Sequence, residues 1–367
     1  MHTYPLKGMN LDEARAVQFR VIDCIMKEFE GHEILSRGDL GVVPGLNKPV
    51  ATSKVERVIA DIFEAESCVL VRGAGSGAIR LGLYSMIGPG EKILIHDAPV
   101  YSTTATSMEM MGLRCMKADY NDPDNLKAVL AKEKDIRGAV VQYTRQKPDD
   151  RYDMESVIRT IKEGADIPIL TDDNYAVMKM KKTGVQCGAD LSCFSSFKLL
   201  GPEGIGIVIG KEKYVRKIVD CSYSGGMQTQ GHEALDVLRG LVYAPVSLAV
   251  EAEVIEECVD RLKKGEVPGI RDAFPANAQS KVLLVEFEED IAEQVLEAAE
   301  RLGAAPNPIG SESKYEMVPM FYRISGTFRR IDPTFEKRMI RINPMRGGAD
   351  TVLRVLKRAM ESVSICF

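Results

Sequence analysis

One lysine of this chain lies in a setting that suits covalent chemistry. Lys198 follows an apolar run that ends near Phe194 and precedes the glycine-rich turn Gly201-Pro202-Glu203-Gly204. The run predicts a strand, which would place Lys198 at the edge of a sheet, where glycines let a ligand approach the backbone. A lysine that is partly desolvated there can form an imine with an aldehyde. Taken alone, the pattern also fits a surface lysine at a strand end, which is the commoner case.

Two carboxylates at the end of an earlier strand are the second chemical feature. Asp172 and Asp173 come directly after the apolar run Ile169-Leu170-Thr171, and open α/β sheets bind ligands at the carboxyl ends of their strands. Pyridoxal 5′-phosphate (PLP) needs an anion beside its pyridine nitrogen, because the protonated ring is the electron sink for a carbanion. An acid and a lysine at two strand ends meet this need, although an Asp-Asp-Asn turn would explain the acids alone.

A run of small residues predicts an anion site. Residues 73–77 (Gly-Ala-Gly-Ser-Gly) lie between an apolar run and a helical pattern, and free N–H groups at a helix start suit a phosphate. A dinucleotide-binding fold is a rival, because the spacing G-x-G-x-x-A fits from Gly73 to Ala78 and Asp97 ends the next strand. That alternative leaves the lysine and the acids unexplained. A Walker P-loop is excluded, since no Gly-Lys-Ser/Thr follows.

These residues need a sheet to bring them together, and the sequence predicts one. From about residue 54 to 210, apolar strand-like runs alternate with amphipathic helical stretches, which predicts an α/β fold with a mostly parallel sheet covered on both faces. A first helix is expected to begin at Ser53, which is a good N-cap residue. The expected strands are residues 92–96, 113–117, 138–143, 167–171, 191–194 and 205–209, and further helices are expected near residues 103–111, 125–132 and 154–163.

The pattern changes beyond residue 230. A long helix is expected at residues 230–264, where Pro245 could break it. A smaller α+β unit should follow, with strands at residues 282–287, 317–324 and 339–342 and helices at residues 291–302 and 349–362. The predicted organisation is therefore an N-terminal arm and loop at residues 1–50, a cofactor-binding large domain at residues 51–245 and a small C-terminal domain at residues 246–367.

Composition excludes several classes of function. Of the 367 residues, 45% are hydrophobic and 28% charged, which is typical of a globular protein, and the net charge of -5 argues against nucleic-acid binding. No secretory h-region and no apolar stretch long enough for a bilayer is found, so we expect a cytoplasmic protein without membrane contact. The eight cysteines are scattered without a C-x-x-C pair, so we expect reduced thiols and neither a metal site nor disulfides.

In this order, the three chemical features resemble the fold-type I family of PLP-dependent enzymes, the aspartate aminotransferase superfamily. The resemblance runs from about Leu35 to the end of the chain. The interval from Asp172 to Lys198 resembles that of cystathionine γ-synthase-like and aluminium-resistance-type PLP enzymes. The segments Thr-Asp-Asp-Asn-Tyr and Ser-Phe-Lys-Leu-Leu-Gly-Pro-Glu-Gly most resemble the YhfS-like group. The resemblance implies the PLP-dependent transferase fold type I, a large domain with a mostly parallel sheet and a smaller α+β C-terminal domain.

The resemblance also implies roles for individual residues. Lys198 would hold PLP as a Schiff base and move protons at the substrate Cα. Asp172 would pair with the pyridine nitrogen, with Asp173 as the rival if the register shifts by one residue. The phosphate would be bound by N–H groups of Gly75, Ser76 and Gly77 and by the hydroxyl of Ser195. Two tyrosines complete the set: Tyr101 would stack on the cofactor ring, unless it is only a partly buried aromatic, and Tyr175 would lie near the ring hydroxyl.

Arginines are the implied ligands for the substrate and for a second subunit. Arg341 would bind the α-carboxylate of an amino acid substrate as a bidentate fork; Arg346 takes this role if the register differs, and a strand arginine paired with a surface acid is equally consistent. Arg37 and the segment Ser224–Thr229 would reach the site of a neighbouring subunit. The resemblance therefore implies a homodimer or a dimer of dimers with shared active sites.

The chain departs from the family pattern at two places. Phe197 stands where cystathionine γ-synthase-like enzymes tend to have a hydroxyl, and residues 142–147 replace the usual strand end, so that Gln142 or Arg145 could face the cofactor or the substrate. The substrate class is therefore open. We expect an aminotransferase first, a β/γ-eliminating carbon–sulfur or ammonia lyase second, and a non-enzymatic PLP-fold protein third.

Overall fold

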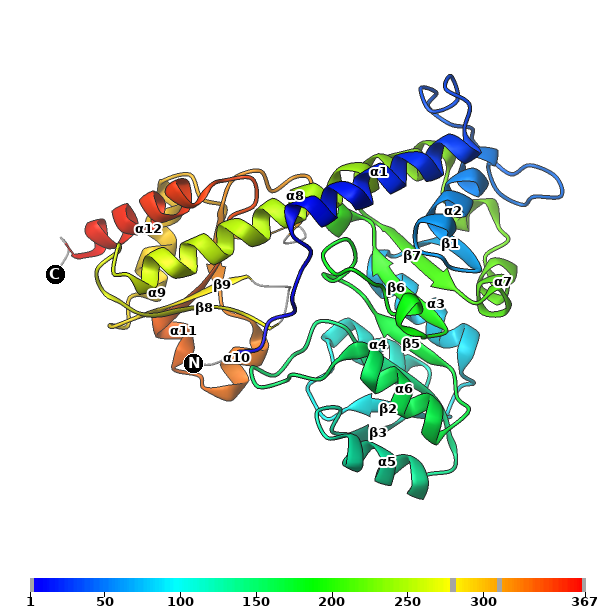
Figure 1. The fold of residues 1–367 in the computed structure, drawn as a ribbon, viewed down its shortest axis with the longest axis horizontal. Coiled ribbons are helices and arrows are strands. Elements are labelled where there is room, and N and C mark those ends of the chain that lie inside the picture. Colours follow the sequence, from blue (N-terminus) through cyan, green and yellow to red (C-terminus); the bar gives the residue numbers. More distant parts are fainter. Residues whose placement is uncertain (1–2, 278–281, 309–311, 365–367) are drawn as a thin grey trace. The chain divides into compact units, whose positions relative to one another are not determined.

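The computed structural model describes residues 3–277, 282–308 and 312–364, and it divides into two compact units (Figure 1). The large unit comprises Asp12–Thr144 and Arg151–Pro245. The small unit comprises Met1–Leu11, Arg145–Asp150 and Val246–Phe367. The chain therefore passes into the small unit after Pro245, and residues 1–50, which we predicted as one arm, are divided after Leu11.

A seven-stranded sheet forms the centre of the large unit, in the order β1-β7-β6-β5-β4-β2-β3 (Figure 1). The strands are β1 (Ser67–Arg72), β2 (Lys92–His96), β3 (Arg114–Ala118), β4 (Ile136–Gln142), β5 (Ile169–Asp172), β6 (Leu191–Ser195) and β7 (Ile205–Gly210). Neighbours from β3 to β6 pair in parallel, whereas β7 pairs antiparallel with both β6 and β1. The short turn between β6 and β7 requires this reversal, because a parallel partner would need a long crossover. The predicted mostly parallel sheet is thus confirmed.

Helices connect these strands. They are α1 (Leu11–Glu28), α2 (Val50–Ile62), α3 (Ala74–Met86), α4 (Ser102–Met110), α5 (Pro123–Lys132), α6 (Met154–Gly164), α7 (Glu212–Cys221) and α8 (Gly231–Lys263), with short 3-10 turns η1 (Val185–Cys187), η2 (Phe197–Leu199) and η3 (Gly225–Met227). Pro245 lies inside α8, which continues through it. None of the helices in the described part of the chain combines the length and the apolar character that a membrane span requires.

The start of α2 differs from the prediction. This helix begins at Val50, three residues before Ser53, because the carboxylate of Asp39 accepts hydrogen bonds from the amides of Val50 at 2.6 Å and Ala51 at 2.9 Å. A capping acid from a distant loop thus replaces the local serine. The helices α1 and α7 were not predicted at all.

Close packing determines the distance between α3 and the sheet. A Cβ atom on Gly82 would lie 2.6 Å from a methyl carbon of Leu170 on β5 and 2.9 Å from the sulfur of Cys193 on β6. The glycine therefore lets the helix approach both strands closely, over a core in which Leu83, Leu170 and Leu191 are fully buried. This packing brings the first turn of α3 to the carboxyl ends of β5 and β6.

The small unit has an antiparallel sheet in the order β10-β11-β9-β8. Its elements are β8 (Ile270–Pro275), β9 (Leu283–Phe287), α9 (Ala292–Arg301), β10 (Met320–Arg323), α10 (Gly326–Ile331), α11 (Phe335–Arg338), β11 (Met339–Asn343) and α12 (Ala349–Ser364). The core lies between the sheet and the helices α9 and α12, where Val285, Val295 and Leu356 are fully buried. The predicted α+β character is confirmed, although β8 was missed and β10 is shorter than expected.

Candidate active site

The strand pairing brings the acid and the lysine to the same edge of the large sheet. Gln142, Asp172 and Cys193 are aligned across β4, β5 and β6. Since these three strands are parallel, their carboxyl ends meet at this edge. Lys198 lies on η2, three residues beyond the end of β6. The two predicted reactive side chains therefore come from the end of β5 and from the turn that follows its neighbour β6.

A closed turn holds Lys198. The hydroxyl of Ser196 donates to the carbonyl of Pro202 at 2.6 Å, and the amide of Gly201 donates back to the carbonyl of Ser196 at 3.0 Å. From α8, Gly240 approaches this turn so closely that a Cβ atom there would lie 2.6 Å from the Gly201 nitrogen. The lysine therefore lies on a turn that is held by its own hydrogen bonds and by packing against α8.

The side chain of Asn174 lies at the centre of the site. Its amide nitrogen donates to Oδ1 of Asp172 at 2.8 Å, and its backbone N–H donates to the same oxygen at 3.1 Å. Its amide oxygen accepts from the backbone N–H of Ser195 at 3.1 Å, from the Ser195 hydroxyl at 2.9 Å and from Nζ of Lys198 at 3.4 Å. One amide therefore connects the acid, the serine and the lysine.

The two neighbouring aspartates have different surroundings. Asp172 is 5% exposed, and its burial raises the pKa of the carboxyl group, whereas Asn174 and the charge of Lys198 act to lower it. Asp173 is fully buried and accepts a hydrogen bond from the amide of Gly184 at 2.8 Å. Burial raises the pKa of Asp173 to about 6. Of the two, Asp172 is thus the one whose carboxylate interacts with the lysine.

The glycine-rich segment forms the first turn of α3, as predicted. Gly73 has a left-handed backbone with φ of 96°, and its amide donates to the carbonyl of Gly204 at 2.8 Å. The amide of Gly77 donates to the carbonyl of Gly73 at 2.8 Å, which makes it part of the helix. The amides of Gly75 and Ser76 belong to the first turn, where a helix provides no partner of its own. The amide of Gly77, which we had also assigned to the phosphate, is by contrast already used within the helix.

This segment also touches the central amide. A Cβ atom on Gly75 would lie 2.6 Å from the amide oxygen of Asn174 and 2.8 Å from its nitrogen. A glycine is therefore needed for the close approach of the helix to the site. Farther along the first turn, the hydroxyl of Ser76 donates to that of Thr103 at 2.9 Å and so links α3 to α4.

The predicted tyrosines differ in their distance from Lys198. The amine of Lys198 lies 3.8 Å from the ring centre of Tyr175, which has a left-handed backbone with φ of 64°. A positive φ is uncommon for a tyrosine and turns this ring toward the lysine. Tyr101 immediately precedes α4, and 49% of its surface is exposed. The structure thus brings Tyr175 to the lysine and leaves the ring of Tyr101 half exposed.

The predicted substrate arginines belong to the small unit. On β11, Nε of Arg341 donates to the carbonyl of Arg323 at 2.7 Å, and its guanidinium lies 4.2 Å from the ring centre of Tyr322. The alternative, Arg346, forms an ion pair with the buried Glu251 at 3.4 Å.

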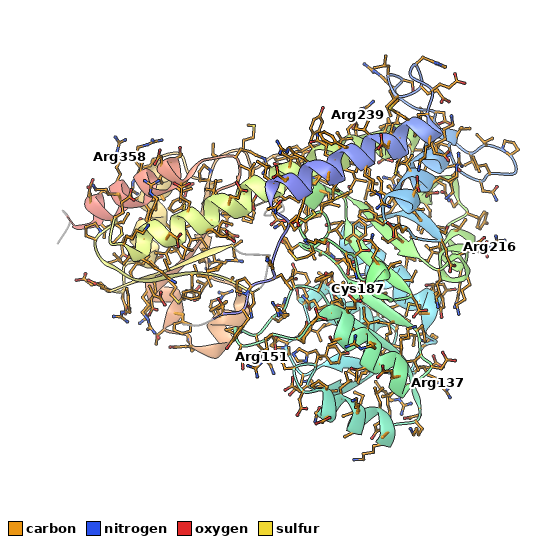
Figure 2. The ribbon with its side chains drawn as sticks, in the orientation of Figure 1. Arg137, Arg151, Cys187, Arg216, Arg239 and Arg358 are labelled. Carbon is orange, nitrogen blue, oxygen red and sulfur yellow. The ribbon has the colours of Figure 1, made fainter. Side chains whose placement is uncertain are left out.

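The sequence also singled out Arg145 and Arg37, and the structure shows what surrounds each of them. Arg145 is 5% exposed and donates to the carbonyl of Tyr4, also in the small unit. Arg37 is exposed in the large unit, in a loop attached to α8. The attachment is made by Arg239, labelled in Figure 2, which donates to the carbonyls of Ile34 and Ser36 at 3.4 Å.

Two features at the sheet edge escaped the sequence interpretation. Asn174 was seen only as part of a motif, although an amide two residues after an acid is a signal for a local turn. An aromatic cluster was also missed: His96 at the end of β2 stacks on Tyr120 with 5.1 Å between ring centres and meets the edge of Tyr152 at 5.0 Å. The amide of Tyr120 donates to Nδ1 of His96 at 3.0 Å. The two tyrosines come from separate loops, so no local pattern links them to the histidine.

The topology contradicts the dinucleotide-binding alternative. That fold requires the first two strands to belong to one parallel arrangement around the glycine loop. Here β1 is an edge strand that pairs antiparallel with β7, while β2, which precedes Asp97, lies near the opposite edge. Among the residues that the structure describes, no three His, Cys, Asp or Glu side chains cluster in a way that could hold a metal ion.

Sequence comparisons cover nearly the whole chain. The model of the class-V aminotransferase family matches residues 50–234, and that of the YhfS-like C-terminal domain matches residues 256–356. The chain is 51% identical over 363 residues to the protein YhfS of Escherichia coli, which covers 99% of this chain and 100% of that protein.

Structure comparisons agree with them. The crystal structure of the PLP-dependent protein YhfS from Escherichia coli superimposes with a TM-score of 0.97 at 50% identity, over 99% of this chain and 100% of that one. A carbon–sulfur lyase involved in aluminium resistance from Clostridium novyi gives 0.73 at 16% identity over 96% and 91% of the two chains. The methionine γ-lyase CalE6 from Micromonospora echinospora gives 0.72 at 16% identity over 94% and 98%. These two share the fold. The chain therefore belongs to the class-V aminotransferase family and, within the fold-type I PLP-dependent enzymes, to the YhfS-like group.

Proposed function

We propose that this protein is a PLP-dependent enzyme that acts on an amino acid and binds its cofactor as a Schiff base on Lys198. The observation that carries the proposal is the convergence of Lys198, Asp172 and the first turn of α3 on the amide of Asn174. The relation to the PLP-dependent protein YhfS, at 50% identity, supports the same cofactor.

The residues present fit PLP. The cofactor has an aldehyde, a basic pyridine nitrogen and a phosphate, and the site offers an amine, a buried carboxylate and first-turn amides within one cluster. We assign the amine to Lys198, the carboxylate to Asp172 and the phosphate donors to the amides of Gly75 and Ser76. The hydroxyl of Ser195, predicted as a further phosphate donor, gives its one proton to Asn174 instead. Asp173 is the weaker choice for the nitrogen, because one of its carboxylate oxygens already accepts from the amide of Gly184.

When bound, PLP supplies an electron sink that weakens the bonds at the substrate Cα. The residues of the chain orient the cofactor and the substrate and transfer the proton at Cα. The Nζ atom of Lys198 is the base that moves the Cα proton, Asp172 holds the ring nitrogen protonated, and Tyr175 orients the lysine from 3.8 Å. On chemical grounds we retain Arg341 as the ligand of the substrate carboxylate and Tyr101 as the stacking aromatic.

The covalent assignment has a direct test. The holoprotein should be yellow, and reduction with borohydride followed by mass spectrometry should place one pyridoxyl group on the peptide that contains Lys198. We expect Lys198→Ala to lose this adduct. Lys213→Ala is the matched control, because Lys213 is an exposed lysine beside Tyr214 on α7, and it should keep the adduct. An unchanged adduct in Lys198→Ala would refute the assignment.

For the reaction, we propose transamination, which the match to the class-V aminotransferase model supports. A carbon–sulfur or ammonia lyase is the second candidate, because lyases are among the proteins that share the fold. A screen of amino acids distinguishes the two when keto acid, ammonia and free thiol are measured separately. Keto acid together with the aminated cofactor indicates transamination, whereas ammonia or thiol without it indicates elimination.

We also propose that the protein is a homodimer, or a dimer of dimers, with shared active sites. The support is chemical: Arg37 is an exposed cation in a loop that Arg239 fastens to α8, and a guanidinium is apt for the phosphate of a neighbouring subunit's cofactor.

A further inference from the structure

The bonds of Asn174 require an amide at this position. Its nitrogen donates to Asp172, whereas its oxygen accepts from Ser195 and Lys198. If oxygen and nitrogen were exchanged, the nitrogen would face the backbone N–H and the lysine amine, both of which are donors. The chemistry of the neighbours thus fixes the orientation of the amide. An aspartate could accept from Ser195 and Lys198 but could not donate to the acid.

The surroundings leave the amide little freedom. Gly75 on α3 stands so close that a Cβ atom there would reach within 2.6 Å of the amide oxygen. On the opposite side, the backbone N–H of Asn174 is itself bonded to Oδ1 of Asp172 at 3.1 Å. Both donors of Asn174 therefore act on the same carboxylate oxygen, and the amide restricts the rotation of the acid.

We propose that Asn174 is a positioning residue: it orients the carboxylate of Asp172 for the cofactor nitrogen and at the same time holds the Lys198 amine on its oxygen. The inference rests on the proposed function, since it assumes that Asp172 faces the pyridine nitrogen of PLP. It goes beyond that function by giving a role to a residue that touches both reactive groups and the serine between them.

The chain contains a matched control. In the turn Asp119-Tyr120-Asn121, Asn121 donates to Oδ1 of Asp119 from its backbone N–H and from its side-chain amide, each at 2.9 Å. Its amide oxygen accepts from the backbone N–H groups of Arg151 at 2.7 Å and Tyr152 at 3.0 Å. The local bonds are those of Asn174 and Asp172, but the turn carries no lysine. Asn121→Asp therefore removes the same kind of side-chain bond to an acid, at a turn whose acid is less buried than Asp172.

The test measures the affinity of the cofactor-free protein for PLP across about pH 5 to 8. The ionisable neighbours of Asp172 are Asp173, Cys193 and Lys198. All of them remain in the variants, and Asn174→Asp adds one carboxylate to them. Because Asn174 lowers the pKa of Asp172, its loss raises that pKa, and the fall in affinity on the acid side moves to higher pH. We expect Asn174→Asp to weaken PLP binding about tenfold at neutral pH and to move this limb up by about one pH unit.

Asn121→Asp should keep the affinity within about twofold and leave the acid limb in place. Asn174→Ala is the second variant, because it removes the side-chain bonds to Asp172, Ser195 and Lys198 without adding a charge, and it decides the question if Asn174→Asp does not fold. Thermal unfolding of the cofactor-free proteins measures the loss of stability separately from the loss of PLP affinity.

The outcomes are distinguishable. The inference is overturned if wild type binds PLP on Lys198 while both Asn174 variants keep its affinity and pH profile, or if Asn121→Asp changes them equally. It is also overturned if the Asn174 variants lose only thermal stability. If wild type itself forms no adduct on Lys198, the proposed function fails first.

Discussion

At the scale of single residues, chemical type and position predicted that an acid and a lysine lie at one edge of the sheet, but not their hydrogen bonds. Lys198 and Asp172 could be placed because each follows an apolar strand, and parallel strands end at one edge. The role of Asn174 could not be predicted, because its oxygen bonds to residues of β6 and η2, more than twenty positions away. Its fit also depends on α3, through Gly75.

The choice between the two aspartates leads to the first residue-scale prediction. We expect Asp172→Asn to weaken PLP binding about tenfold or more, because a hydrogen bond between charged groups contributes roughly 1.5–3 kcal/mol. Asp173→Asn should keep the affinity within a few-fold, since its carboxylate bonds to Gly184 instead. PLP titrations of the cofactor-free proteins measure both. The opposite ranking would mean that the register of the Asp-Asp pair is shifted by one residue.

Asp173 also leads to a prediction on stability. Its pKa is about 6 in the folded protein because of burial, against an ordinary value of 3.8. The protonated form therefore stabilises the fold below about pH 4, and this contribution is lost as the pH rises to about 6. In Asp173→Asn an uncharged amide can still accept from Gly184 through its oxygen.

We expect the free energy of unfolding of wild type to fall relative to Asp173→Asn by up to ~3 kcal/mol between pH 4 and pH 7. Urea unfolding of the cofactor-free proteins at several pH values measures the difference. A difference that does not change with pH would show that the buried carboxyl group titrates normally.

At the scale of elements, strands with a clear apolar pattern were predicted well. Features that depend on contacts between distant parts of the chain were not predicted. The strand Lys92–His96 was predicted to the residue, because a short apolar run follows a glycine–proline turn. The predicted start of α2 was wrong, because the acid that caps this helix is Asp39, eleven positions before Val50. The antiparallel direction of β7 was not predicted, because it depends on how the short turn after Lys198 reverses the chain.

Alanine substitutions at Gly75 and Gly77 of α3 should distinguish an effect on stability from an effect on cofactor binding. A Cβ atom on Gly77 would lie 2.1 Å from the carbonyl oxygen of Arg72, which is backbone and cannot move easily. A Cβ atom on Gly75 would instead meet the side chain of Asn174, which would have to give up its bonds in the site in order to move. We therefore expect Gly77→Ala to lower the stability by roughly 1–3 kcal/mol. Gly75→Ala should mainly weaken PLP binding, by about tenfold.

Thermal unfolding and PLP titration of the two variants measure this contrast. Gly31→Ala provides the control, because this glycine is exposed and nothing lies within 4 Å of its added Cβ, and it should change neither quantity. Equal losses of stability with unchanged PLP affinity in the two α3 variants would show that Gly75 is needed only for folding.

At the scale of the whole molecule, the sequence predicted two units and their classes, because composition and periodicity change near the end of the large sheet. It could not predict that Arg145–Asp150 and the first eleven residues join the small unit. Such joining depends on long-range bonds, such as those from the side-chain amide of Asn277 to the carbonyls of Lys147 at 3.0 Å and Asp150 at 2.9 Å. A local pattern contains no trace of them.

The proposed sharing of sites between subunits can be tested by mixing two defective chains. Arg37→Ala alone should bind PLP about tenfold more weakly, since one phosphate ligand is lost, and Lys198→Ala alone should form no adduct. In a mixed dimer, the Arg37→Ala chain keeps its own Lys198 and receives Arg37 from its partner. After dissociation and reassociation at equal amounts, about half of the Arg37→Ala chains have such a partner. At limiting PLP, borohydride reduction and mass spectrometry should then show the adduct on about half of these chains. If mixing leaves the adduct at the level of Arg37→Ala alone, Arg37 serves its own subunit or none, because no shared site has been restored.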